Sequence, residues 1–145
     1  MKKYAVAIAA LTLAACAPPP EPLKVTASGK PEIDCKEPPE EMRDRLVESV
    51  IKLPGVSIEQ SDTHLVKVSM QDNSIGTALL TPRYAANRVS ASYYIARNGE
   101  GSRVIGSIQR QSQNAFGQTT VAQVEHQAAL NQMQNFLWRV PCTVQ

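Results

Sequence analysis

Apolar residues recur every three or four positions between residues 39 and 54, and this is the clearest pattern in the chain. The spacing is typical of a helix with one buried face. Pro39 suits the first turn of such a helix, because its missing N–H costs nothing there. Pro54-Gly55 then ends the pattern. The sequence therefore predicts a helix that begins near Pro39 and ends before Pro54.

A second apolar stripe with helical spacing lies near the C-terminus. It contains Ala122, Ala129, Met133, Phe136, Leu137 and Val140. Thr120-x-x-Gln123 matches a capping box, in which two side chains satisfy the first free N–H groups of a helix. Pro141 stops the stripe. We therefore expect a second helix from Thr120 to just before Pro141.

Alternation of apolar and polar residues predicts four strands. They are expected at residues 56–59, 65–70, 88–97 and 103–112. A polar turn joins the first two strands, and Asn98-Gly99, a strong hairpin signal, begins the turn between the last two. Two hairpins and two helices predict an α+β fold, a two-layer sandwich with about four antiparallel strands and both helices on one face. The polar positions of the strands are expected to face water or a hydrophilic partner.

Residues 71–87 interrupt this order of elements. Asp72-Asn73-Ser74, Gly76 and Pro82 break any period, and the segment is long for a connection within a compact domain. Leu79-Leu80 lies inside it. Two interpretations stay open: these apolar residues contact a partner, or they close an edge of the core.

The first sixteen residues differ from the rest of the chain. Lys2 and Lys3 are followed by an uncharged run from Ala5 to Ala15, which is too short for a membrane-spanning helix of about 20 residues. A basic start, an apolar middle and small residues at the end are typical of a secretory signal. A plain secretory peptide or a buried N-terminal helix would share this pattern, but neither explains the cysteine that follows directly.

The stretch Leu13-Ala14-Ala15-Cys16 resembles the end of a bacterial lipoprotein signal. The resemblance covers the signal alone. It implies that residues 1–15 are removed and that Cys16 then carries a diacylglycerol on its sulfur and an acyl chain on its amine. In Gram-negative members of this class the next residue directs sorting, and Ala17 in place of aspartate implies the outer membrane. We expect a lipid-anchored protein that faces the periplasm and has no other cofactor and no metal.

Proline is concentrated just after the predicted lipid anchor. Residues 16–31 contain five prolines together with Gly29. Proline-rich segments are extended and semi-rigid. We therefore expect residues 16–31 to form a tether and residues 32–145 to form a single α+β domain.

Two cysteines remain once Cys16 is lipidated. Cys35 and Cys142 are expected to form a disulfide, because paired thiols oxidise in the periplasm. A redox pair or a metal site is the alternative, but the sequence has no Cys-x-x-Cys. Cys35 precedes the first predicted helix and Cys142 follows the second, so a disulfide between them predicts antiparallel helices packed side by side.

The charges of the chain are unevenly distributed. Loss of Lys2 and Lys3 with the signal leaves equal numbers of acidic and basic side chains, yet only Glu100 and Glu125 are acidic after residue 72. That half carries Arg83, Arg88, Arg97, Arg103, Arg110 and Arg139. Either the arginines are solvated or paired with the acidic half of the domain, or they bind an acidic partner surface or an anionic lipid. Nucleic acid is not an expected partner of a periplasmic protein.

Motifs for catalysis are absent from the sequence. It has no G-x-S-x-G elbow, no H-E-x-x-H helix and no phosphate loop. The two histidines, His64 and His126, stand at no spacing typical of metal ligands. We therefore expect a protein that is not an enzyme.

Two functions fit these expectations. The first is a non-catalytic accessory or assembly subunit, anchored to the outer membrane, that binds or positions another component of the cell envelope. Its predicted layout resembles that of the lipoprotein that plugs the lipopolysaccharide-inserting barrel, and those of small lipoproteins of secretion or conjugation machines, but layout transfers no residue role. The alternative is a module that binds an anionic glycan, lipid or inhibitor target through Arg88, Arg97, Arg103 and Tyr94.

Overall fold

A computed structural model gives the structure of residues 26–71, 88–114 and 116–145. The predicted signal at residues 1–15, most of the tether and the irregular segment with Leu79-Leu80 lie outside these residues.

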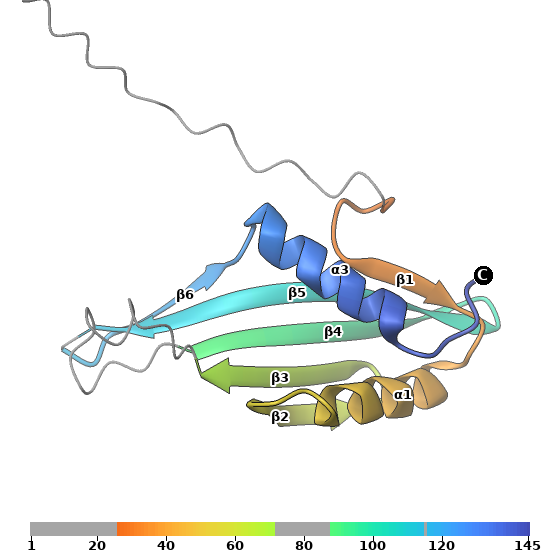
Figure 1. The fold of residues 1–145 in the computed structure, drawn as a ribbon, viewed down its shortest axis with the longest axis horizontal. Coiled ribbons are helices and arrows are strands. Elements are labelled where there is room, and N and C mark those ends of the chain that lie inside the picture. The colour runs from red at the N-terminus through yellow and green to blue at the C-terminus, as the bar shows by residue number, and fades with distance from the viewer. Residues whose placement is uncertain (1–25, 72–87, 115) are drawn as a thin grey trace, which may run out of the picture.

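The described chain folds into a mixed α+β structure (Figure 1). Its elements are β1 (Glu32–Cys35), α1 (Pro39–Ile51), β2 (Val56–Asp62), β3 (Leu65–Gln71), β4 (Arg88–Asn98), β5 (Gly101–Gln113), β6 (Thr119–Gln123) and α3 (Gln127–Arg139). The strands form one antiparallel sheet in the order β1-β5-β4-β3-β2, and β6 also pairs with β5. The α+β class is therefore confirmed, whereas the expected number of about four strands is wrong, because the sheet has six.

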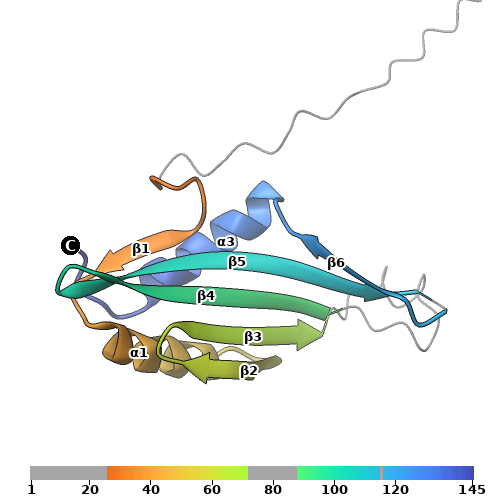
Figure 2. The same cartoon turned by 180° about the vertical axis from the view of Figure 1, so that it is seen from behind.

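Both predicted hairpins are present. β2 pairs with β3 from Val56↔Met70 to Asp62↔Leu65, and β4 pairs with β5 along its whole length. In β4 the alternate residues Val89, Ala91, Tyr93 and Ile95 share one face of the sheet. Figures 1 and 2 show both helices on one side of the sheet, running in roughly opposite directions.

The first helix agrees with its prediction and supplies much of the core. α1 begins at Pro39 and ends at Ile51, and its side chains Met42, Leu46 and Val50 are buried. They belong to one cluster that includes Val66, Val68, Ile95 and Val104 of the sheet and Met133, Leu137 and Val140 near the C-terminus. Burial of this stripe is what holds a helix of 13 residues in place, since helices of that length are marginal in isolation.

The start of the second helix is corrected by the structure. Residues 119–123 form β6, which pairs with the end of β5 in a further antiparallel hairpin. α3 begins only at Gln127. Thr120 and Gln123 are therefore strand residues, and no capping box forms. Two neighbouring threonines and Val121 favour a strand, and β5 extends far enough to pair with them. The end of the helix at Arg139, before Pro141, agrees with the prediction.

β1 is the strand for which the sequence has no clear signal. It has four residues, with only Ile33 and Cys35 turned toward the core. Its outer edge is occupied by Gln134 of α3, whose Oε1 accepts a hydrogen bond from the Glu32 N–H at 2.8 Å and whose Nε2 donates to the Glu32 carbonyl at 2.8 Å. The C-terminal segment completes the edge, because the Gln145 N–H donates to the Asp34 carbonyl. β1 thus pairs with β5 along one edge and, along the other, with Gln134 and the C-terminal segment, more than 100 residues away.

Glu37 lies where the two ends of the domain meet, and its carboxylate is almost fully buried. It accepts hydrogen bonds from the N–H and the hydroxyl of Thr143 and pairs with Arg45 at 2.9 Å. Burial of the carboxyl opposes ionisation, but the Thr143 hydrogen bonds and the Arg45 charge outweigh it, so the pKa of Glu37 is lowered.

The lowered pKa of Glu37 predicts an acid-dependent loss of stability. A carboxyl whose pKa is lower in the folded than in the unfolded chain stabilises the fold above its ordinary pKa of 4.5, and this contribution is lost as the pH falls through the folded pKa. We expect Glu37→Gln to lower the free energy of unfolding at pH 7 and to have less effect at pH 3. Denaturant unfolding of both proteins across this range measures the difference, and an equal effect at both pH values would contradict the assignment.

Candidate functional site

The two cysteines of the domain form the predicted disulfide. Cys35 and Cys142 are bonded, with their Cα atoms 5.7 Å apart and 107 residues between them in sequence. These cysteines and Glu37 are the one group of at least three close metal-binding side chains in the described part of the chain. Both sulfur atoms are in the disulfide, and the Glu37 carboxylate already bonds Thr143 and Arg45. The group as folded therefore provides no thiolate ligand, and its carboxylate is occupied.

Arg103, one of the candidate contact residues, is held within the sheet by an acid. Its Nε and Nη2 donate to the two carboxylate oxygens of Asp34 on β1, at 2.7 and 2.9 Å. The hydrogen bonds and charge of Arg103 lower the pKa of Asp34 despite partial burial, and Asn98 adds a further donor. Arg103 therefore ties β1 to β5, and much of its charge is neutralised.

Arg88 is paired in a similar way at the other end of the sheet. Glu59 of β2 lies 3.3 Å from the Arg88 guanidinium and 3.1 Å from the Lys67 ammonium. The hydrogen bond from Lys67 is the largest influence on Glu59 and lowers its pKa. Among the described residues, the acidic half of the chain thus compensates Arg88 as well as Arg103.

The three candidate arginines do not share one surface. Arg97 stands opposite Ser102 on the helix side of the sheet, whereas Arg88 and Arg103 project from the other side. Arg103 pairs with Ala96, eight positions along β4 from Arg88. At ~3.3 Å per residue, about 26 Å of strand separates the two arginines.

Tyr94 lies between these two arginines, on the face of the sheet that neither helix covers. We call this the open face (Figure 2). Tyr94 is 49% exposed and stands opposite Ile105 of β5 and Leu65 of β3. Ser69, Ser90 and Ser92 lie on the same face and are buried. The predicted polar residues are therefore on this face, but these three serines do not face water as expected, and an aromatic ring lies near the centre of the face.

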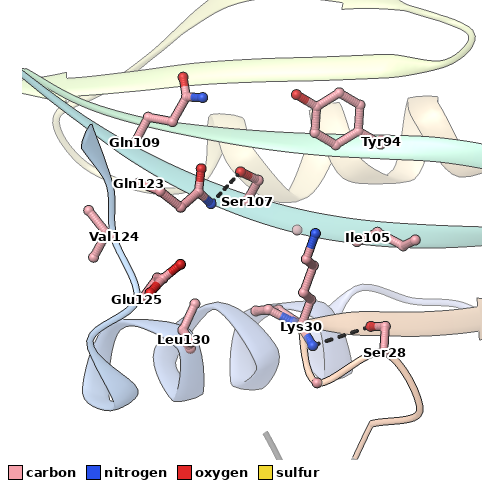
Figure 3. A pocket seen from close by; sticks show the side chains of 13 residues that line it. Ser28, Lys30, Tyr94, Ile105, Ser107, Gln109, Gln123, Val124, Glu125 and Leu130 are labelled. Carbon is pink, nitrogen blue, oxygen red and sulfur yellow. Dashed lines mark hydrogen bonds between the residues drawn. The ribbon is translucent and has the colours of Figure 1, made fainter. Parts of the chain in front are cut away.

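A notch opens at the edge of β5 beside the open face (Figure 3). β1 pairs with β5 up to Ile105 and β6 pairs with it from Gln109 onward, so a gap lies between them. The notch has a volume of about 540 Å³. Its walls come from residues 28–31, Tyr94, residues 105–107, Gln109, residues 123–125 and Leu130.

The side chains of the notch are mainly polar and carry both signs of charge. Lys30 approaches from the N-terminal turn and Glu125 from the connection between β6 and α3 (Figure 3). Gln123 Nε2 donates to the Ser107 hydroxyl at 2.9 Å, and Gln109 lies next to them. Neither histidine nor cysteine is among the lining residues. Such a site can form hydrogen bonds with a polar ligand and provides one charge of each sign. Its lining residues include no nucleophile hydrogen-bonded to a histidine base.

A second hollow, of about 650 Å³, lies on the helix side of the sheet. It runs from Leu53, just after α1, to Met133 and Phe136 of α3, and the expected close packing of the two helices is therefore incomplete. Tyr93 lies at its floor, with its ring centroid 5.5 Å from that of Phe136, and burial raises the pKa of its hydroxyl.

The turn between β5 and β6 holds a feature that the sequence does not reveal. Phe116 is 90% exposed, and its backbone N–H is hydrogen-bonded. Asn114 Oδ1 accepts from the N–H groups of Phe116 and Gln118 at 3.0 and 2.9 Å, and Gly117 adopts a positive φ of 79°. A phenylalanine in a predicted loop gives no sign of whether it packs inward or is presented to solvent.

Comparisons with known proteins provide no relative for this chain. No protein-family model, no curated protein and no solved structure matches it. In the described ranges, neither helix has the length and apolar character needed to cross a membrane.

Proposed function

We propose that this chain is a non-catalytic lipoprotein of the outer membrane that binds or positions another cell-envelope component through the open face of its sheet. In this proposal the domain is a two-layer sandwich, with both helices on one side and the partner on the other. The lipoprotein signal at Cys16 and the disulfide between Cys35 and Cys142 support a periplasmic location.

The observation that carries the proposal is the placement of Tyr94. A half-exposed tyrosine near the centre of a sheet face, with Leu65 and Ile105 opposite it on the neighbouring strands and a polar notch beside it, is typical of a preformed binding surface. Tyrosine also provides a large contact area at a low cost in conformational entropy. A rigid sheet presents it without rearrangement.

The alternative function, capture of an anionic ligand by an arginine cluster, has weaker support. It would need several cations close together, but Arg88 and Arg103 are each paired with an acid and Arg97 projects from the opposite face. Protein contacts around Tyr94 need no such cluster. We therefore favour a protein partner.

Photo-crosslinking in the outer membrane tests the proposal. A photoreactive phenylalanine at position 94 of the full-length protein is expected to form an adduct with one envelope protein, which mass spectrometry identifies. The matched control is the same group at Trp138, which is 56% exposed on α3. Adduct formation at 94 but not at 138, reduced several-fold by excess protein with unmodified Tyr94, supports the proposal. No adduct at 94, or the same adduct at both positions, would overturn it.

The lipid anchor has a separate test. Cys16→Ser removes the sulfur that receives the diacylglycerol, so the variant is expected to accumulate as an unprocessed precursor. Electrophoretic mobility and metabolic labelling with a fatty acid measure both effects. Normal processing with retention in the outer membrane would show that Cys16 is not the anchor.

A further inference from the structure

The outer edge of β6 exposes hydrogen-bonding groups of the backbone. In an antiparallel pair, alternate residues direct both N–H and C=O toward the neighbouring strand. The Asn114 N–H donates to the Gln118 carbonyl and the Val124 N–H donates to the Ile108 carbonyl, so the even-numbered residues of β6 face β5. Thr119, Val121 and Gln123 consequently direct their N–H and C=O groups outward. Within the described residues, no strand pairs with this edge (Figure 1).

The other edges of the sheet are protected in ways that β6 is not. Gln134 and the C-terminal segment cover β1, as described above. β2 has an irregular register between Ile58 and Gln60 and carries Glu59 and Asp62. Bulges and charges of this kind discourage the addition of another strand. β6 has neither charge, proline nor irregular register, and its residues Thr-Thr-Val-Ala-Gln are all exposed.

The sequence around β6 is suited to meeting a copy of itself. From Gln111 to Val124 there is no charged residue, so two copies approach without electrostatic repulsion. The same hairpin carries the exposed Phe116, whose N–H donates to Asn114 Oδ1. It also ends beside the notch, whose wall includes Val124 and Leu130. In a two-fold symmetric interface both copies use the same surface, so an apolar projection of each copy can contact the hollow of the other.

We propose that two copies of this chain associate by antiparallel pairing of β6 with β6, with Val121 on the two-fold axis. Thr119 of each copy then stands opposite Gln123 of the other. This register brings Phe116 of one copy opposite position 126 of the other, next to the Val124 wall of the notch. The two sheets join into one continuous sheet, and Tyr94 stays exposed on both copies. The proposal goes beyond the proposed function, because the second copy adds at an edge and the envelope partner binds a face.

Cysteine crosslinking in the full-length, membrane-anchored protein tests this register. Directly opposed residues in such a pair have Cα atoms about 5.5 Å apart, within the range that a disulfide spans. Val121→Cys is therefore expected to give a band of twice the chain mass on a non-reducing gel, which reductant returns to the single-chain band. Thr119→Cys alone is the matched control and should give none, because the introduced thiol would face Gln123 of the other copy. The double variant Thr119→Cys/Gln123→Cys should restore the band.

A proline substitution tests the role of the outward N–H. Val121→Pro removes one outward donor and leaves the pairing with β5 intact, since Val121 gives no hydrogen bond to β5. Light scattering of the detergent-solubilised protein is expected to show a dimer for wild type and Val121→Thr, and a monomer for Val121→Pro. Circular dichroism that matches wild type shows that the variant is folded.

The outcomes separate this proposal from the proposed function. A monomeric wild type, or equal crosslinking by Val121→Cys and Thr119→Cys, would overturn the dimer. The position-94 adduct with an envelope protein would still form in that case. Loss of that adduct with the Val121→Cys band retained would overturn the proposed function and leave the dimer standing.

Discussion

Cys142→Ser is expected to lower the free energy of unfolding by about 4–5 kcal/mol, the largest effect of any single substitution considered for this domain. The disulfide closes a loop of more than 100 residues, so its loss greatly increases the conformational freedom of the unfolded chain. It also joins the start of α1 to the segment after α3, and Cys35 is fully buried. Urea unfolding of the oxidised wild type and of the variant measures the difference.

Reduction of the wild-type protein provides the control for this prediction. Complete reduction should shift the unfolding midpoint of wild type toward that of Cys142→Ser and should leave the midpoint of the variant unchanged. Small domains have a total stability of about 5–15 kcal/mol, so the variant is expected to be partly unfolded near 37 °C if the wild type lies at the lower end. An unfolding midpoint that reduction does not change would contradict the stabilising role of the disulfide.

Gln134→Leu is expected to destabilise the domain by about 2–4 kcal/mol, because it leaves the N–H and C=O of Glu32 without their partner. Gln134 is only 2% exposed and acts on the edge of β1 as a neighbouring strand would. Leucine has nearly the same size and is a good helix former, so the effect reports the lost hydrogen bonds. Denaturant unfolding measures the stability, and hydrogen exchange of the β1 amides should accelerate more than that of the β4 amides.

Gln132→Leu is the matched control for Gln134→Leu. Gln132 is on the same helix and is exposed, so the change should alter stability by about 0.5 kcal/mol or less. Equal effects of the two substitutions would show that the Gln134 amide is not what holds β1 at the edge of the sheet.

Local sequence patterns were sufficient for the parts of the fold in which near neighbours in the chain interact. α1 has its own apolar stripe and its own start and stop residues, and each hairpin has a turn signal between two alternating strands. The disulfide was predictable because the sequence has two cysteines besides Cys16, the one expected to carry lipid. The polar character of the open face and the exposure of Tyr94 on it agree with the alternation of β4.

Local patterns misled where a tertiary contact decides the outcome. Thr120-x-x-Gln123 satisfies the rule for a helix start, but β5 offers these residues a ladder of hydrogen bonds, and the strand forms instead. The six arginines of the second half suggested a cation-rich surface. The sheet brings Asp34 to Arg103 and Glu59 to Arg88, pairings that span 69 and 29 residues.

The sequence by itself therefore determined α1, the two hairpins and the cysteine pairing, because each depends on spacing within a short stretch or on a residue count; the lipid anchor at Cys16 stays a prediction. Only the tertiary structure decided the existence of β1, the strand at residues 119–123 and the neutralisation of Arg88 and Arg103. The physical reason is the same in each case. A hydrogen bond or ion pair forms only when the fold brings its two partners together. The partners of β1, Arg88 and Arg103 are distant in the chain, whereas residues 119–123 pair with nearby β5, a choice that their helix-like spacing does not reveal.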